Sequence, residues 1–147
     1  MSKKEIRRVL GFDYGRLRIG VAVGQTITGS ANPVCVLKAR DGQPNWGEIE
    51  ALLQQWQPDA LIVGKPMHMD GNPHEVTAAA IKFGNRLHGR YGYQVFMVDE
   101  RLSSVAAEEL MRELPSGMRT GKMELDSMAA KVIVETWLAQ QQGNSQQ

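Results

Sequence analysis

Acidic residues stand at three places where the chain is otherwise apolar. Asp13 follows the apolar run in "VLGFD", the pair Asp99 and Glu100 ends "VFMVDE", and Asp126 opens the apolar face of the last predicted helix. A carboxylate at the border of a core costs free energy unless something pairs with it. Three carboxylates brought together repel one another unless a cation lies between them. The acids therefore predict a site for a divalent metal ion.

Mg²⁺, or Mn²⁺ in its place, is the cation that suits such a site. It prefers oxygen ligands, keeps several of its waters, and is commonly held by a few carboxylates together with substrate phosphates. Two such ions about 3.5–4 Å apart activate water and stabilise the leaving oxygen of a phosphodiester. The chemistry that these residues predict is metal-dependent hydrolysis of a phosphodiester, with Asp13, Asp126 and one acid of the 99–100 pair as ligands.

Each acid also has an ordinary structural explanation. An Asp before a Gly is typical of a turn, which applies to Asp13. Asp126 suits the first turn of a helix, where it interacts with the helix dipole. Asp99 and Glu100 point to opposite faces of a strand, so only one of them is a ligand, and the pattern alone does not choose between them. The case for a site depends on the three acids meeting in one architecture.

The elements that would position these acids alternate between the two periodicities. Strand-like runs cover about 6–15, 18–25, 32–39, 60–64 and 93–100, and the glycine-bearing turns between the first three predict antiparallel neighbours. Asn45, with Glu48 three residues later, predicts the start of a helix that ends before Pro58. Further helices are predicted to run from about Val76 to Leu87, from Ser103 or Ser104, and from Asp126 to Gln140.

This order predicts a ribonuclease-H-like α/β domain. Three antiparallel strands are followed by two strands that are each reached through a helix, which gives a mixed five-stranded sheet with helices on both faces. The first, fourth and fifth strands would be parallel, and their carboxyl ends would meet at one edge, where the acids fall. We expect a single domain over residues 1–147, with about 141–147 as a disordered tail.

Charge, cysteine content and hydropathy limit the partners and the cellular location that we expect for the protein. The net charge of +1 by itself gives no indication of nucleic-acid binding, so phosphate contacts would need a local cluster of Lys and Arg side chains. Such bases flank the predicted site elements and form a predicted rim: Arg16, Arg18, Lys65, Arg101, Arg119 and Lys122. With no apolar run long enough to span a bilayer and no export signal, we expect a cytoplasmic protein without membrane contact. Cys35, the single cysteine, is interpreted as a small packed hydrophobe.

Other chemistries find no support in the sequence. His68, His74 and His88 do not form a zinc-binding pattern, and neither a G-x-S-x-G elbow nor a G-x-x-x-x-G-K-[ST] loop is present. Helix capping accounts for Ser103 and Ser104. Tyr14 has two open roles, stacking on a nucleobase or packing inside the domain.

Four segments together resemble the YqgF (RuvX) family of Holliday-junction-resolvase-like pre-16S rRNA nucleases. They are "GFDYGRLRIGVAVG", "LIVGKPMHMDG", "VDERLSS" and "DSMAAKVIVETWL", and the similarity extends from about Arg7 to Gln140. The resemblance implies a ribonuclease-H-like fold and a metal-dependent nuclease that matures the 5′ end of 16S ribosomal RNA. By motif it implies Asp13, Glu100 and Asp126 as catalytic metal ligands, with precursor rRNA as the favoured substrate and DNA as the alternative.

Two features leave alternatives open. True Holliday-junction resolvases of this fold carry a catalytic glutamate at the end of the fourth strand, where this chain has Gly64 and Lys65, so junction cleavage is the weaker expectation. Nothing in the sequence shows a dimer surface, and the protein is expected to be a monomer or a weak homodimer. A non-catalytic module that binds nucleic acid or an assembly partner stays open. An actin-type sugar kinase would need a second domain, which 147 residues do not supply.

Overall fold

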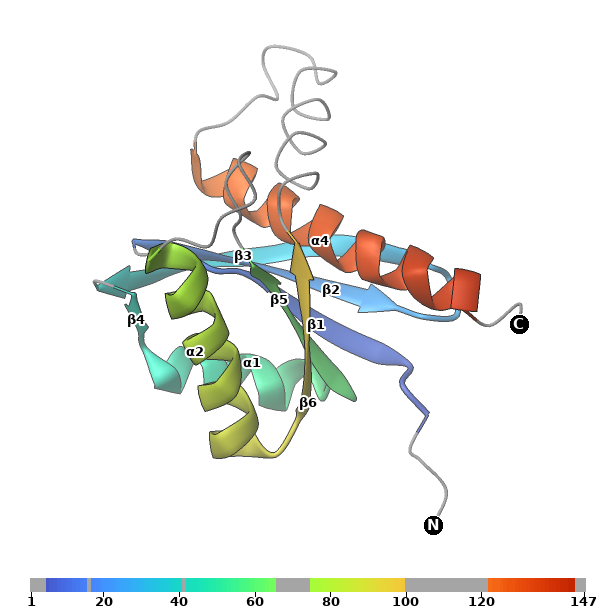
Figure 1. Cartoon of the computed structure of the whole chain (residues 1–147), viewed down its shortest axis with the longest axis horizontal. Helices are drawn as coiled ribbons and strands as arrows, with labels where there is room; N and C mark the ends of the chain where they lie inside the picture. Colours follow the sequence, from blue (N-terminus) through green and yellow to red (C-terminus); the bar gives the residue numbers. More distant parts are fainter. Residues whose placement is uncertain (1–4, 16, 41, 66–74, 100–121, 145–147) are drawn as a thin grey trace.

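The computed structural model describes residues 5–15, 17–40, 42–65, 75–99 and 122–144. At residues 65, 75, 76, 99, 122–126 and 142–144 it describes the backbone alone. Within these ranges it shows one mixed sheet with helices on both of its faces (Figure 1). The predicted fold class is confirmed. The helix predicted to begin at Ser103 or Ser104 lies outside the described residues.

The sheet has the strand order β4-β3-β2-β1-β5-β6. β1 is antiparallel to β2 and parallel to β5, β5 is parallel to β6, and β2 and β3 are antiparallel. Six strands are present where five were predicted, because two residues after the turn at Gly42 pair with the end of β3. The strands are β1 Arg8–Asp13, β2 Arg18–Gln25, β3 Ser30–Arg40, β4 Gln43–Pro44, β5 Ala60–Lys65 and β6 Gln94–Asp99.

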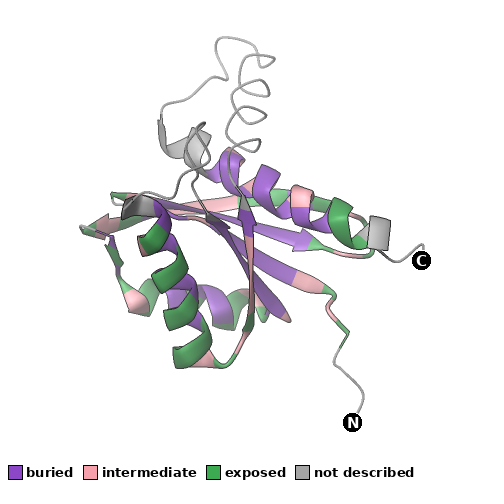
Figure 2. Cartoon of the chain, in the orientation of Figure 1, coloured by how far each residue is buried: buried purple, intermediate pink, exposed green. Residues whose placement is uncertain are grey.

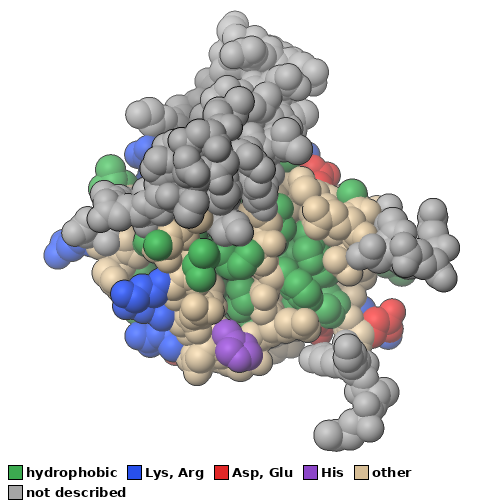
Figure 3. Space-filling view, viewed as in Figure 1, with side chains coloured by type: hydrophobic (Ala, Val, Ile, Leu, Met, Phe, Trp, Pro, Cys, Tyr) green, Lys and Arg blue, Asp and Glu red, His purple; other side chains and the backbone are tan. Residues whose placement is uncertain are grey.

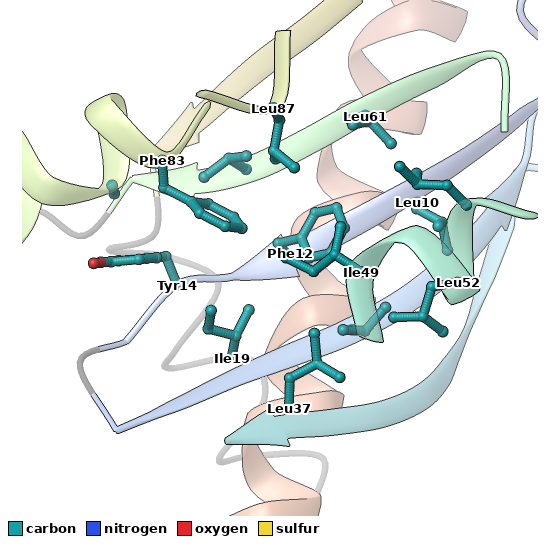
Figure 4. Close-up of a cluster of buried hydrophobic side chains, with 14 of the residues drawn as sticks. Leu10, Phe12, Tyr14, Ile19, Leu37, Ile49, Leu52, Leu61, Phe83 and Leu87 are labelled. Atoms are coloured by element: carbon teal, nitrogen blue, oxygen red, sulfur yellow. The ribbon is translucent and has the colours of Figure 1, made fainter. Parts of the chain in front are cut away.

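Two helices cover one face of the sheet. α1, Trp46–Trp56, begins at the predicted cap, where the side chain of Asn45 accepts a hydrogen bond from the backbone N–H of Gly47 at 3.0 Å. α2, Glu75–Tyr91, lies beside it. Both bury apolar side chains against alternate residues of the central strands, as Figures 2 and 4 show. The largest fully buried members of this α1/α2-side core are Leu10, Phe12, Ile19, Ile49, Leu61 and Leu87.

A single long helix, α4, Lys122–Asn144, crosses the opposite face (Figure 1). Its predicted apolar stripe is buried, with Ala129, Ala130, Ile133 and Trp137 each at most 5% exposed. The last three of these pack with strand residues such as Val9, Ile62 and Val98 in what we call the α4-side core. The helix begins four residues before the predicted start and continues to Asn144, so residues 141–144 are helical where a tail was predicted. Among the described helices, none combines the length and apolar character that crossing a bilayer requires.

Burial on both faces explains why the central strands form continuous apolar runs in the sequence. In β1, Val9 packs on the α4 side, while Leu10 and Phe12 pack on the α1/α2 side. The faces of the remaining strands follow from the same alternation. This assignment of faces is what locates the acids.

Candidate active site

The carboxyl ends of the three parallel strands lie in register at one edge of the sheet. Asp13, the last residue of β1, is paired with Gly64 of β5, and Gly64 is in turn paired with Val98 of β6. Lys65 and Asp99 form the next pair along the same edge. The structure therefore brings the end of β1 and the end of β6 to either side of β5, as the sequence predicted.

Asp13 belongs to the face that α4 covers. Val9 packs in the α4-side core, and a Cβ at Gly11 would overlap the side chain of Val134 on α4. Two residues further along the same strand, Asp13 continues this face. Its side chain is half-buried, at the point where the sheet ends.

The register of α4 on the sheet places Asp126 at the level of Asp13. Gly24, which pairs with Val9, lies against Val134 and Leu138, whereas Gly11 lies against Val134 and Ala130. Two residues along β1, a rise of roughly 6.6 Å, thus correspond to about one turn of α4, a rise of roughly 6 Å.

One further step in the same direction leads from Gly11 to Asp13 on the strand and from Ala130 to Asp126 on the helix. The backbone of Asp126, which lies in the second turn of α4, therefore comes to the edge of the sheet where β1 ends. Glu100, the third predicted acid, lies outside the described residues.

Gly64 leaves the position beside Asp13 without a side chain. Ile62, two residues earlier in β5, packs on the α4 side, so Gly64 falls on that side as well. This is the strand end at which true resolvases would carry their glutamate. In this chain Gly64 offers no side chain at that position.

Tyr14 packs inside the domain and is not placed to stack on a nucleobase. It lies on the α1/α2 side, opposite to Asp13, and only 6% of it is exposed. Its hydroxyl donates a hydrogen bond to the carbonyl of Gly42 at 3.0 Å, and its ring lies 5.2 Å from that of Phe83 (Figure 4). A nucleobase has no access to this ring, so the stacking alternative is wrong.

Part of the predicted basic rim is described. Arg18 is half-buried, and its Cα pairs with that of Lys38 on β3, which is exposed. The next pair along these strands, Ile19 and Leu37, packs on the α1/α2 side. Arg18 and Lys38 therefore lie on the α4 side. Sequence reasoning missed Lys38, which only the strand register places beside Arg18. Of the other predicted bases, Lys65 and Lys122 are described as backbone only, and Arg16, Arg101 and Arg119 lie outside the described residues.

The donor chemistry of this edge fits a divalent cation. A carboxylate at a strand end, next to a glycine and level with a second acidic position, offers oxygen ligands, which hard divalent ions prefer. The residues whose side chains are described contain no cluster of three His, Cys, Asp or Glu. The side chains of Asp126 and Glu100 are outside that set.

Cys35 is not a candidate nucleophile. It is half-buried on β3, and burial, with a smaller contribution from the negative charge of Glu48, raises the pKa of its thiol. A raised pKa lowers the fraction of reactive thiolate at neutral pH. The prediction that Cys35 serves as a small packed hydrophobe is consistent with this position, because its side chain packs against the α1/α2-side core.

The strand order, the parallel strand ends and the position of α4 on the face of Asp13 define the molecule as a ribonuclease-H-like domain. Solved structures of Holliday junction resolvases share this fold at low sequence identity. RuvC of T. thermophilus, in complex with a Holliday junction substrate, matches with a TM-score of 0.58 and 17% identity over 93% of this chain and 96% of that one. The fowlpox virus Holliday junction resolvase matches with a TM-score of 0.54 and 12% identity, over 91% of this chain and 99% of the resolvase chain.

The chain belongs to the RuvX family, whose description is "Holliday junction resolvase" and whose model matches residues 7–140. Two relatives are named "Putative pre-16S rRNA nuclease". The relative from Pseudomonas aeruginosa (strain LESB58) is 50% identical over 141 residues, covering 95% of this chain and 96% of its own. The relative from Nitrosococcus oceani is 52% identical over 143 residues, which cover 96% of this chain and 92% of the relative. The family and these relatives make the protein a nuclease, a hydrolase of phosphodiester bonds.

Proposed function

We propose that this nuclease cleaves precursor ribosomal RNA at the 5′ side of the 16S sequence, with Mg²⁺ as its natural ion and Asp13, Glu100 and Asp126 as the catalytic ligands. The observation that carries the proposal is the register of α4, which brings the turn of Asp126 level with Asp13 at the end of β1. The relatives of about 50% identity, through their names, support the choice of this substrate. Such a substrate would place the enzyme in the cytoplasm, where we expect it to act as a monomer or a weak homodimer.

The choice of Glu100 over Asp99 has a physical argument in the packing of β6. Phe96 and Val98 pack with the α4-side core, whereas Val95 and Met97 pack with the α1/α2-side core. Even-numbered positions of this strand thus share the side of Asp13, and the alternation extended by one residue favours position 100. The motif resemblance favours the same residue.

The chain's own groups would divide the work between binding and positioning. A divalent ion, when bound, supplies a water of lowered pKa and neutralises the charge that develops on the phosphate. Asp13 and Asp126 would hold that ion from the strand end and from the helix. Arg18 and Lys38 lie on the same face of the sheet as Asp13. They would bind phosphates that flank the scissile bond and so position the RNA backbone across the site.

An RNA fragment that spans the 5′ boundary of 16S tests the substrate. We expect the purified chain to cleave it in Mg²⁺, to lose that activity in excess EDTA, and to regain it when Mg²⁺ is restored. A four-way DNA junction of equal length is the comparison substrate. Faster cleavage of the junction would overturn the RNA assignment, and binding of both without cleavage of either would show a binding module.

The choice between the adjacent acids is tested by the isosteric pair Glu100→Gln and Asp99→Asn. Loss of a direct ligand costs more than the roughly 10–100-fold that loss of an outer-shell group costs, so Glu100→Gln is expected to lower the cleavage rate by more than about 100-fold. Asp99→Asn is expected to keep at least about a tenth of the activity. The measurement is the initial cleavage rate at saturating Mg²⁺. The reverse order of the two rates would contradict the alternation argument.

A further inference from the structure

The outer face of α2 carries basic residues at every fourth position. Lys82, Arg86 and Arg90 are all exposed and lie on one line along the helix. We call these three residues the α2 stripe. Figure 3 shows Lys and Arg side chains gathered on the α2 side of the molecule. None of them was among the predicted phosphate contacts, because they lie far in sequence from the acids.

Helix stability does not account for the stripe. Like charges four residues apart destabilise a helix. Within the described residues, neither Lys82 nor Arg86 forms an ion pair with a carboxylate; Arg86 donates a hydrogen bond to the side-chain oxygen of Gln43 at 3.1 Å. Arg90 also has a contact within the domain, since its guanidinium lies 4.2 Å from the centre of the Trp46 ring in the last turn of the helix.

The edge of the sheet at which Asp13 ends β1 is called the acid edge. The stripe begins near this edge, and its last residue lies beside acidic side chains. α2 follows β5, which ends at that edge, and leads into β6, which starts at the other. Lys82 is thus roughly 10 Å along the helix from its first residue, and Arg90 roughly 22 Å. Arg90 itself lines a hollow of about 830 Å³ whose lining also includes Glu50 and Asp59, which would repel phosphate.

The dimensions of the stripe fit a nucleic-acid backbone. From Lys82 to Arg90 the helix rises roughly 12 Å. A strand of duplex DNA places one phosphate every 3.4 Å of its axis, and on that scale this length corresponds to about three or four phosphates of one strand. Flexible, exposed cations without carboxylate partners are the groups that bind such a backbone without reading its sequence.

We propose that the α2 stripe is a second binding surface, which holds the phosphate backbone of a double-helical arm of the RNA whose scissile bond lies at the acid edge. This rests on the proposed nuclease function and extends it. The structure then has two phosphate-binding regions: the site bases Arg18 and Lys38 on the α4 side, and the stripe on the α1/α2 side. The stripe would select substrates with a duplex flank over short single strands.

The double variant Lys82→Gln/Arg86→Gln tests the stripe through binding alone, measured without Mg²⁺ so that cleavage plays no part. The probe is an RNA hairpin with an arm of at least about ten base pairs, since roughly 22 Å must be spanned. We expect about tenfold weaker binding, and a slope of log K against log salt that is shallower by about 1.8, or 0.9 for each lost phosphate contact. Binding of an oligonucleotide too short to reach α2 should change by less than about twofold.

The control is Arg7→Gln/Lys131→Gln, which removes the same net charge from residues outside the stripe. Arg7 pairs with Glu5, and Lys131 with Glu135 on α4. We expect the control to change the salt slope by less than half of the stripe variant's shift. If the slope of log K against log salt shifts equally in the two variants, then the effect is one of net charge and the proposal is wrong. An unchanged slope in the stripe variant would also overturn the proposal. Both outcomes are independent of whether the protein cleaves RNA.

Discussion

Replacing Asp13 by Asn is expected to lower the rate of RNA cleavage by more than about 100-fold while the protein stays folded. Asparagine has the same shape but no charge, so it is a poor ligand for a hard divalent cation. The backbone of residue 13 keeps its pairing with Gly20 and Gly64, which holds the strand in place. The measurements are the single-turnover cleavage rate across a Mg²⁺ titration and the Tm.

The matched control is Asp59→Asn, which makes the same chemical change at the opposite end of the sheet. The Asp59 carboxylate accepts hydrogen bonds from the backbone N–H groups of Arg7, at 2.8 Å, and Arg8, at 3.1 Å. Its replacement should lower the Tm and leave the cleavage rate of the folded protein within about threefold of the parent. If Asp13→Asn cleaves at the parental rate, then the acid edge is not the active site.

The architecture could be predicted because its signals are local. The apolar runs of β1 and β5 indicate strands buried on both faces, and the side chain of Asn45 caps α1 at the position that its pattern predicted. The convergence of strand ends then follows from the parallel pairing of β1, β5 and β6. For this reason the local pattern of residues was enough to place Asp13 at an edge of the sheet.

What the sequence could not show depends on which face each element covers. The alternation of β6 was clear, but the sequence could not show that Phe96 and Val98 pack on the α4 side, which favours position 100 over position 99 as a neighbour of Asp13. Tyr14 was ambiguous for the same reason, since its burial depends on α2 and on the turn at Gly42. The pairing of Lys38 with Arg18 depends on strand register, which local patterns do not fix.

The extra length of α4 has a different cause. Its ends carry polar residues such as Gln140, so apolar periodicity fades there although the backbone remains helical. Glutamine, lysine and glutamate are good helix formers, and no proline interrupts residues 122–144. Apolar periodicity therefore identified the part of the helix that is buried against the sheet and not its full length.

Gly11→Ala is expected to be the most damaging small substitution in the core. A Cβ at this position would overlap Cγ2 of Val134 and approach the carbonyl of Ala130 to 3.7 Å. Because valine is branched at Cβ and stiff at χ1, it has little freedom to move aside, so α4 must shift away from β1. Overpacking of this kind lowers the free energy of unfolding by about 1–3 kcal/mol, which urea denaturation would measure.

The same shift should disturb the proposed active site, since the close contact at Gly11 belongs to the register that brings the backbone of Asp126 level with Asp13. We expect the cleavage rate of the folded Gly11→Ala protein, measured well below its Tm, to fall by about tenfold to 100-fold, because misplacement by about 1 Å has effects of that size. The control is Gly89→Ala on α2, where an added Cβ meets no atom within 4 Å. It should raise stability by about 0.5–1 kcal/mol and leave cleavage unchanged. If Gly11→Ala loses stability but keeps full activity, then the close packing of α4 on β1 stabilises the fold without positioning the acids.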